Sequence, residues 1–297
     1  IFNLDTILLD FENFLLSHTP KAQSFHPHFQ EAVWEMVKCG GKRFRPALLL
    51  SVAGNYNPSI IKEAFYPALA MEILHTFSLI HDDLPSIDNA PLRRGHPTLH
   101  TRYGEVTAIL SGDFLNSYAF YLLTISGLED RVISRLTHSL SRGSCQMIVG
   151  EALDCEFEGE SLGLRKVEQI HRLKTAYLIA TSLQMGAIIA GVDRLEEQKL
   201  WEFGEKLGVF FQIRDDLVDA LQSATQAGKP TQSDGEKNSY VTLLGLEGAR
   251  KEVDSYVRDL QTMLQGLQNP NLQITLSKLL EKYWQEILGF FGWIFVK

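Results

Sequence analysis

Two short segments of this sequence are dense in aspartate, although apolar residues flank both of them. They read DDLPSID at 82–88 and DDLVD at 215–219. Two carboxylates about 4 Å apart repel each other by roughly 4 kcal/mol at an effective dielectric of 20, so each cluster needs compensation. Oxygen ligands without histidine or thiolate favour Mg²⁺, which keeps some of its water and often bridges carboxylates to phosphate groups. The alternative interpretation is a solvated acidic helix face, which two clusters in apolar surroundings disfavour.

The second cluster is predicted to lie along one face of a helix. Segment 203–219 supplies apolar bulk at helical spacing, and its polar residues fall at i, i+3, i+4 and i+7. Residues at this spacing share a helix face. The residues concerned are Gln212, Asp215, Asp216 and Asp219.

The first cluster is predicted to lie at the end of another helix. The same spacing rule places His75, Leu79 and Asp82 on one stripe. Pro85 is expected to end or kink this helix, because proline lacks a backbone N–H and fixes φ. Asp88 would then return from the following loop towards Asp82.

Four segments supply the positive charge that such a site needs. They read GGKRFRP at 40–46, LRRG at 92–95, HRLKTA at 171–176 and AGKPTQSDGEKNSY at 227–240. Arginine suits bidentate contact with phosphate, and lysine acts as a point charge. Each cation alone is more typical of an ordinary surface, but together they predict two anionic sites.

One anionic site is predicted to be bridged by metal and lined by Lys174, Lys229 and Lys237. The other is predicted to hold its anion directly, through Lys42, Arg45 and Arg94. His75 lies one helical stripe below Asp82, so it is expected to hydrogen-bond an anion, although a core histidine would fit the same pattern. His81 and His171 lack this support and are expected to have no role in the site.

Composition limits the classes of protein that fit. The chain has 297 residues, 45% of them apolar, which is enough for a large core, and its net charge of −8 argues against a general nucleic-acid binder. Its three cysteines form no C-x-x-C pair, which favours a reduced, cytoplasmic compartment. The segment 1–16 carries acids and no basic region, unlike a signal peptide. No apolar run reaches the roughly 18 residues of a membrane span, so no stable membrane insertion is expected.

Helical periodicity dominates the chain, and alternating strand patterns are scarce. Helices are expected at 4–16, 24–38, 60–83, 105–126, 129–157, 166–191, 195–222, 239–265 and 272–289. A further helix is expected to start at Pro46. These elements predict one all-α domain over 1–297, with 290–297 as a possible tail, built as a helical bundle around a central cavity. Four glycines are expected to permit close helix approach: Gly186, Gly191, Gly204 and Gly208.

The order of the motifs resembles that of the trans-isoprenyl diphosphate synthases, and most of all the bacterial farnesyl diphosphate synthases. The resemblance rests on GGKRFRP, HTFSLIHDDLPSID, LRRGHPT, HRLKTA and FFQIRDDLVD, and covers roughly residues 25–250. It implies the isoprenoid-synthase all-α fold, a homodimer and a Mg²⁺-dependent prenyltransferase. Such enzymes condense an allylic diphosphate with isopentenyl diphosphate, head to tail.

The resemblance also implies a role for each candidate residue. Three Mg²⁺ ions per active site are expected, held by Asp82, Asp88 and Asp215, with Asp83, Asp216 and Asp219 as further ligands or water holders. The allylic diphosphate is expected to contact Arg93, Lys174, Lys229 and Lys237, with Gln212 beside its metals. Isopentenyl diphosphate is expected to contact Lys42, Arg45, His75 and Arg94. The catalytic residues are expected to be Lys174, Thr175 and Gln212, the last two stabilising the allylic cation.

Product length is expected to depend on Phe77, which lies about 7.5 Å down the helix from Asp82 at 1.5 Å per residue. Its ring would close the pocket, which the neighbouring Ser78 would not, and a C15 product is expected. Plain core packing of Phe77, with a C10 or C20 product, is the alternative.

Some positions depart from the family pattern. Ala90 and Pro91 stand where relatives commonly have acids, Glu151 where they often have glutamine, and Ser239 where threonine is usual. The C-terminal segment also lacks the usual basic ending. Three other classes of protein are alternatives to a farnesyl diphosphate synthase: a geranylgeranyl diphosphate synthase, a terpene cyclase, and a non-catalytic synthase subunit. A cyclase needs no second diphosphate site, and a subunit would usually have lost one acid cluster.

Overall fold

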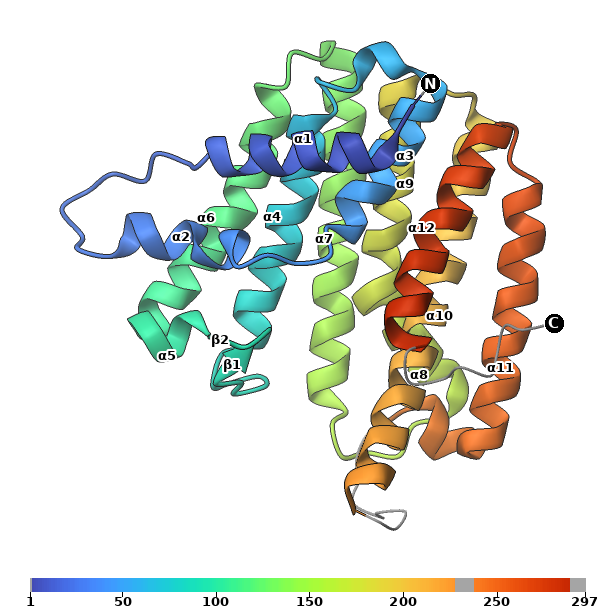
Figure 1. Cartoon of the computed structure of the whole chain (residues 1–297). Helices are drawn as coiled ribbons and strands as arrows, with labels where there is room; N and C mark the ends of the chain where they lie inside the picture. Colours follow the sequence, from blue (N-terminus) through green and yellow to red (C-terminus); the bar gives the residue numbers. More distant parts are fainter. Residues whose placement is uncertain (1, 228–237, 289–297) are drawn as a thin grey trace.

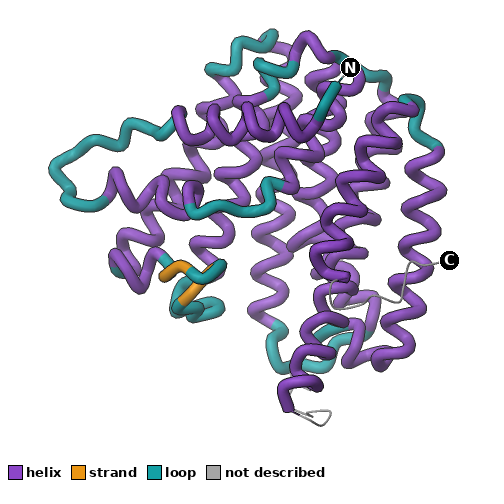
Figure 2. Tube along the Cα trace, viewed as in Figure 1, coloured by secondary structure: helices purple, strands orange, loops and turns teal. Residues whose placement is uncertain are grey.

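The structure is a computed structural model that describes the backbone of residues 2–227 and 238–288, and the side chains of 2–221 and 238–281. Nearly all regular structure is helical (Figures 1 and 2), which confirms the expected all-α class. The elements are α1 Leu4–Ser17, α2 Phe29–Lys38, α3 Phe44–Tyr56, η1 Pro58–Ile60, α4 Phe65–Asp82, β1 Leu92–Arg93, β2 His96–Pro97, α5 Leu99–Tyr103, α6 Glu105–Thr124, α7 Asp130–Glu156, α8 Leu164–His171, η2 Arg172–Ala176, α9 Tyr177–Ala190, α10 Arg194–Ala227, α11 Tyr240–Gln265 and α12 Pro270–Leu288.

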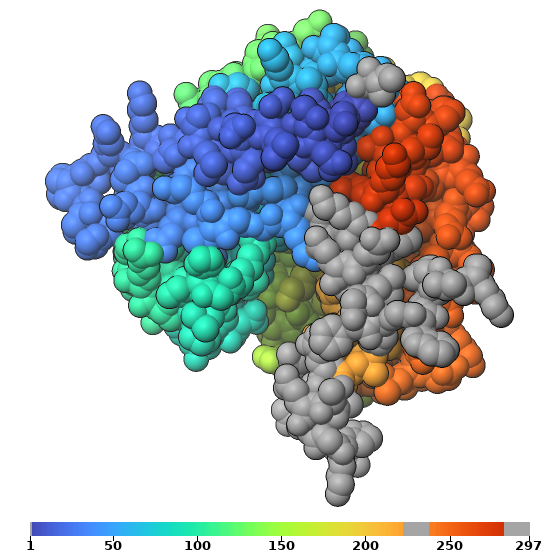
Figure 3. All heavy atoms as spheres, in the orientation of Figure 1, coloured from blue at the N-terminus to red at the C-terminus, as the bar shows by residue number. Residues whose placement is uncertain are grey.

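The long helices pack side by side as a bundle (Figure 1). Helix α4 packs on α6, α9 packs on α3, α7 and α10, and α11 packs on the outer side of α10. Helix α1 (dark blue in Figure 3) lies across the surface of the bundle and contacts α3 and α4. The helices α4, α7 and α10, which carry the two acidic motifs and Glu151, therefore belong to one packed body.

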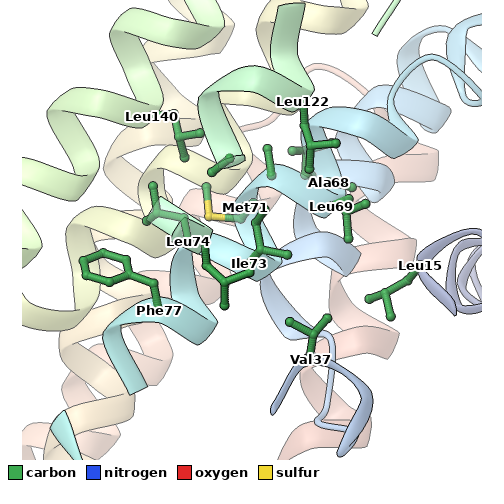
Figure 4. Packing of buried hydrophobic residues seen from close by; sticks show 14 of the residues in the cluster. Leu15, Val37, Ala68, Leu69, Met71, Ile73, Leu74, Phe77, Leu122 and Leu140 are labelled. Carbon is green, nitrogen blue, oxygen red and sulfur yellow. The ribbon is translucent and has the colours of Figure 1, made fainter. Parts of the chain in front are cut away.

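Two clusters of buried apolar side chains fill the bundle. One joins α1, α2, α4 and α6 and reaches α7, and Figure 4 shows part of it, with Met71, Leu74 and Phe77 of α4 among the labelled side chains. The other joins α8, α9, α10, α11 and α12. Helices α3 and α9 contribute to both clusters, so they connect the two halves of the core.

Helix α3 is the main element absent from the list of periodic segments, although Pro46 was expected to begin a helix. Nine of its thirteen residues are buried. A helix that is apolar on all sides has no polar face and so shows little periodicity, which explains why the pattern missed it. The expected helices at 24–38 and 60–83 begin later than predicted, at Phe29 and Phe65.

The helix expected at 166–191 is interrupted by a π-helical turn at Arg172–Ala176, which carries Lys174 and Thr175. π-Turns within α-helices are rare and often occur at functional sites. Helix α7 approaches this turn very closely, because a Cβ on Gly150 would lie 2.2 Å from the Lys174 backbone nitrogen.

The whole stretch Leu164–Ala190 is long and apolar enough to span a membrane. However, 67% of its most apolar window is buried inside the bundle, so core packing explains its composition.

Three of the four glycines expected at close contacts are confirmed there. A Cβ would lie 2.5 Å from the Leu49 carbonyl oxygen at Gly186, 2.5 Å from Ala180 Cα at Gly204, and 2.2 Å from Ala176 Cα at Gly208. The expectation for Gly191 is wrong. A Cβ there would meet nothing within 4 Å, and with a φ of 70° this residue instead ends α9 in the left-handed conformation.

A short hairpin that was not predicted carries Arg93 and Arg94. Strands β1 and β2 pair antiparallel, with Leu92 opposite Pro97 and Arg93 opposite His96. Arg94 and Gly95 between them have φ values of 54° and 79°. Two successive positive φ angles are the mark of a type I′ turn, whose twist matches that of the paired strands. Arg93 on β1 and Arg94 in the turn therefore have different backbone conformations, and their side chains point in different directions.

Candidate active site

The two acidic motifs face one cavity of about 680 Å³. Asp82 at the end of α4 and Asp215 on α10 both line it, together with Lys174 and Thr175 of the π-turn. Residues more than a hundred positions apart in the chain therefore line one cavity, and the expectation of a central cavity is confirmed.

A second cavity of about 640 Å³ adjoins the first. The two share Arg93, Glu151, Lys174, Gln212 and Asp215 along their common border. Asp88, Asp216 and Asp219 line the second cavity. All four polar residues of the predicted stripe on α10 thus face this space, as the spacing indicated.

The loop after α4 returns as predicted. Helix α4 ends at Asp82, and the backbone N–H of Asp88 donates a hydrogen bond of 2.9 Å to the Asp82 carbonyl oxygen. This contact brings the Asp88 side chain back beside the end of the helix, which a straight continuation would have carried away.

Asp83, unlike Asp82, points away from the cavities. Its side chain is only 2% exposed and lines neither of the two cavities. Both carboxylate oxygens accept from Arg93 Nε at 2.8 Å, and one also lies 2.7 Å from Arg93 Nη2. Asp83 therefore holds Arg93 at the border of the cavities, while its own role towards metal stays a prediction.

For two of the acids, burial makes the ionised carboxylate unfavourable. Burial, followed by the nearby Glu151 carboxylate, raises the pKa of Asp82 to about 7. Burial also raises the pKa of Asp216 to about 7, although its carboxylate accepts a hydrogen bond of 2.9 Å from the Tyr240 backbone N–H. The negative charge of Asp215 is partly offset by Arg214, whose Nη2 lies 2.5 Å from Asp215 Oδ1. Cations from outside the protein would relieve this charge.

The donor set fits Mg²⁺ in the way the sequence indicated. Among the described residues, no three acidic, histidine or cysteine side chains converge closely enough to hold a metal by themselves. Mg²⁺ commonly binds through one or two carboxylates and completes its shell with water and substrate phosphate oxygens. Asp82 and Asp215 line the first cavity and Asp88 the second, and their role as magnesium ligands stays a prediction.

Lys174 is held by two acids on α7 that sequence reasoning did not assign to the site. Its Nζ donates to Asp154 at 2.7 Å and to Glu151 at 3.1 Å. Although burial acts to lower it, these carboxylates raise the pKa of Lys174, so the residue is a fixed cation. Glu151 had stood out only as a departure from the family pattern, and Asp154 gave no signal.

Three of the residues predicted to hold an anion directly lie together, and their role towards an anion stays a prediction. Lys42, Arg45 and His75 all line the first cavity. Burial and the adjacent arginines lower the pKa of His75 well below its ordinary value, so the neutral ring accepts from Arg45 Nη1 at 3.1 Å through Nε2. Arg45 Nε is buried without a partner among the described residues. The pair therefore presents positive charge with unused donor capacity.

Arg94 and Arg43 do not line the first cavity. Arg94 is nevertheless close enough that, besides burial, its charge helps to lower the pKa of His75 and of Arg45, and its Nη1 donates 2.7 Å to the carbonyl oxygen of Gly40. Arg43, which the motif suggested would present its charge beside Lys42 and Arg45, is buried instead. It donates to Glu72 at 2.8 Å and to Glu12 at 2.9 Å. It anchors the loop before α3, so only two cations of GGKRFRP reach the cavity.

Known proteins match the chain over most of its length. The family model described as polyprenyl synthetase matches residues 26–280. The chain belongs to the polyprenyl synthetase family. A curated farnesyl diphosphate synthase of Geobacillus stearothermophilus is 41% identical over 80% of this chain and 82% of that protein. A chloroplastic geranylgeranyl pyrophosphate synthase of Capsicum annuum is 37% identical over 81% of this chain and 67% of that protein.

Solved structures agree with this assignment. A geranyltransferase from Helicobacter pylori, complexed with magnesium and isoprenyl diphosphate, superposes with a TM-score of 0.86 at 43% identity. The match covers 95% of this chain and 96% of that one. Its likeness extends over the whole bundle of this polyprenyl synthetase, including the helices that carry both acidic motifs.

Phe77 and Ser78 of this polyprenyl synthetase both line the first cavity, on the side below Asp82. The Phe77 ring is 5% exposed and stands edge-on to His81, with 5.2 Å between ring centres. Ser78 turns its hydroxyl back to the His75 carbonyl oxygen at 2.8 Å. Apolar side chains complete the walls: Phe44, Met147, Ile148, Ile179 and Phe211. These side chains make most of the cavity lining apolar.

Two predicted residues of this polyprenyl synthetase, Lys229 and Lys237, lie outside the described residues. His171, in contrast, was expected to have no role in the site. It lines the second cavity, and its ring stacks on Tyr240, whose N–H holds Asp216. Burial lowers the pKa of His171 to about 4.

The raised pKa values of Asp82 and Asp216 predict how stability changes with pH in metal-free protein. Between pH 3.8 and about 7 the folded protein keeps protons that the unfolded chain has released, so the stability that these groups contribute falls as pH rises. The double variant Asp82→Asn, Asp216→Asn lacks both titrations. We expect the advantage in free energy of unfolding of the double variant over wild type to grow by about 5 kcal/mol from about pH 5 to about pH 8, since each of the two groups contributes about half of this change. Urea denaturation in EDTA measures this.

A change at an exposed carboxylate on the same helix as Asp216 serves as the control. Glu202 is exposed on α10, so Glu202→Gln should follow the wild-type pH dependence. Parallel profiles for wild type and the double variant would show that the two carboxyls are not perturbed.

Proposed function

We propose that this polyprenyl synthetase is a Mg²⁺-dependent prenyltransferase of the farnesyl diphosphate synthase type. It condenses dimethylallyl or geranyl diphosphate with isopentenyl diphosphate, head to tail, and its final product is farnesyl diphosphate. The observation that carries this proposal is one apolar cavity lined by both acidic motifs and by two separate groups of cations. A reaction that joins two diphosphate esters needs two anion sites facing one water-poor space.

The first step is ionisation of the allylic diphosphate. Mg²⁺, once bound, supplies positive charge that makes diphosphate a better leaving group. Lys174 and Arg93 contact the same group and stabilise the charge that develops as the C–O bond breaks, which is usually the largest catalytic effect. The oxygens of Thr175 and Gln212, both on the cavity wall, face the resulting allylic cation.

The second step joins the two substrates. Lys42, Arg45 and the neutral His75 hold isopentenyl diphosphate so that its double bond faces the cation. The alkene electrons form the new C–C bond, and a proton then leaves the adjacent carbon. The departing diphosphate accepts this proton. The apolar walls keep water from capturing the cation before the alkene does.

The alternatives are less well supported by the site. A terpene cyclase also ionises an allylic diphosphate, but it has no need of the second cationic group around Arg45 and His75. A non-catalytic synthase subunit has no need of two intact acidic motifs facing one cavity. A geranylgeranyl diphosphate synthase would share this whole site and differ only in the depth of the cavity.

Product analysis distinguishes these functions. We expect protein incubated with Mg²⁺, geranyl diphosphate and labelled isopentenyl diphosphate to yield labelled farnesyl diphosphate, and EDTA to abolish the reaction. Release of diphosphate without incorporation of label would identify a cyclase. Tight binding of both substrates without turnover would identify a subunit.

Phe77 is proposed to set the C15 limit, because its ring narrows the cavity below the end of α4. We expect Phe77→Ala to extend the products to C20 or longer, measured by chromatography of the dephosphorylated alcohols. Removing a buried ring costs about 3–5 kcal/mol, so the variant is first checked for cooperative unfolding. Ser78→Ala is the matched control and should keep the C15 product. An unchanged product from the Phe77 variant would assign this residue to core packing alone.

We also propose that the enzyme is a homodimer formed through α6. Val106, Ile109, Leu110 and Tyr121 are 40–71% exposed along one side of this helix, whose other side packs on α4. Exposed apolar side chains at helical spacing are typical of an interface, and a second copy of the same helix would cover them symmetrically.

Light scattering tests the dimer. We expect a mass twice the 33.5 kDa of the chain, and a shift towards monomer for Leu110→Glu. Leu9 is 69% exposed on α1, away from this face, so Leu9→Glu should remain dimeric. A monomeric wild-type protein would exclude the interface.

A cytoplasmic location is proposed on chemical grounds. All three cysteines are free thiols, and both substrates of the proposed reaction are highly charged small molecules that a reducing aqueous compartment would supply.

A further inference from the structure

Glu151 stands at the border between the two cavities and contacts the lysine proposed to bind the allylic diphosphate. Its carboxylate oxygens lie 2.9 and 3.1 Å from Lys174 Nζ, and its side chain is 19% exposed. Asp154, one helical turn further along α7, contacts the same nitrogen at 2.7 Å. Two of the three donors of the ammonium group are therefore already used by carboxylates.

The charges around Lys174 do not cancel. One ammonium group faces the two carboxylates of Glu151 and Asp154, and Asp82 lies close enough to Glu151 to feel its charge. Asp215 lines the same border. Arg93 lines the same border, but it is paired with Asp83, and Arg214 is paired with Asp215. With these pairs counted, Glu151 and Asp154 still outnumber Lys174, so a polyanion that approaches Lys174 without counter-charge meets a surface that is negative overall.

We propose, on the basis of the function proposed above, that Glu151 is a specificity-determining residue that strengthens the dependence of diphosphate binding at Lys174 on an accompanying divalent cation. The negative charge of Glu151 repels a diphosphate that carries no metal. The Glu151 carboxylate also accepts a hydrogen bond from Lys174, which uses a donor that the diphosphate would need. A diphosphate that arrives with divalent cations carries less net negative charge, and those cations are attracted by the same carboxylates. Glu151 thus favours the metal-bound form of the ligand over the free form.

The variant Glu151→Gln isolates the charge. Glutamine has nearly the same shape and keeps an oxygen that accepts from Lys174, so the local packing is retained while one negative charge is lost. Glu151→Asp keeps the charge. Glu156→Gln is the matched control, because Glu156 is exposed on the same helix and lines neither cavity.

Calorimetric binding of inorganic pyrophosphate to the full chain tests the proposal without turnover, in EDTA and in Mg²⁺. For wild type we expect one metal-independent binding event, at the site of Arg45 and His75, and a second event at the Lys174 site that is present in Mg²⁺ and much weaker in EDTA. The affinities compared below are those of the second event. For Glu151→Gln we expect the affinity in EDTA to rise about tenfold, because a unit charge at hydrogen-bonding distance from Lys174 no longer opposes the anion. Its affinity in Mg²⁺ should change much less. Glu151→Asp and Glu156→Gln should both behave as wild type.

Two outcomes would overturn the inference while leaving the proposed function intact. One is an unchanged affinity of Glu151→Gln in EDTA, and the other is an equal gain for Glu156→Gln, which would indicate a general effect of net charge. Failure of the proposed function would look different, because wild type itself would then bind pyrophosphate no better in Mg²⁺ than in EDTA. Thermal unfolding of each variant shows whether its fold is retained.

Discussion

The carboxylates of this site repel one another, and the fold must hold them together against this repulsion. Asp82 ends α4, Asp88 is brought back beside it by a backbone hydrogen bond, and Asp215, Asp216 and Asp219 project from α10. Burial raises the pKa of Asp82 and Asp216, which means that their charged forms destabilise the protein without a ligand. The rest of the bundle must therefore supply enough packing to keep these groups close until cations and diphosphate offset their charge.

Close helix packing supplies this support next to the site. Gly150 lets α7 approach the π-turn that carries Lys174 and Thr175, and Gly208 lets α10 approach the start of α9. A buried ion pair between Arg43 and Glu72 fixes the loop that presents Lys42 and Arg45. The functional side chains thus stand on elements whose positions are determined by contacts outside the cavity.

Residue spacing predicted the site best where helical periodicity decides orientation. The stripe on α10 and the return of Asp88 follow from local rules, and the structure bears out both. Helix α3 was indicated only by Pro46 and not by periodicity, because it is buried on nearly all sides, and it begins two residues earlier, at Phe44. The π-turn was not predicted because its sequence continues a helical pattern. The placements of Asp83, Arg43 and Arg94 were not predictable locally, since each is set by a partner distant in the chain. The same holds for Asp154, which no motif indicated.

The two proposed anion sites differ in charge rather than in shape. Around Lys174 the protein supplies more carboxylates than cations, so a diphosphate is stabilised there only with added positive charge. Around Arg45 the hydrogen-bond partner is the neutral His75, and Arg45 forms no ion pair with a carboxylate among the described residues. Under the proposed function, this site would stabilise a diphosphate directly. The two proposed substrates share the same headgroup, so metal ions would distinguish them, because only the diphosphate at Lys174 would need accompanying cations.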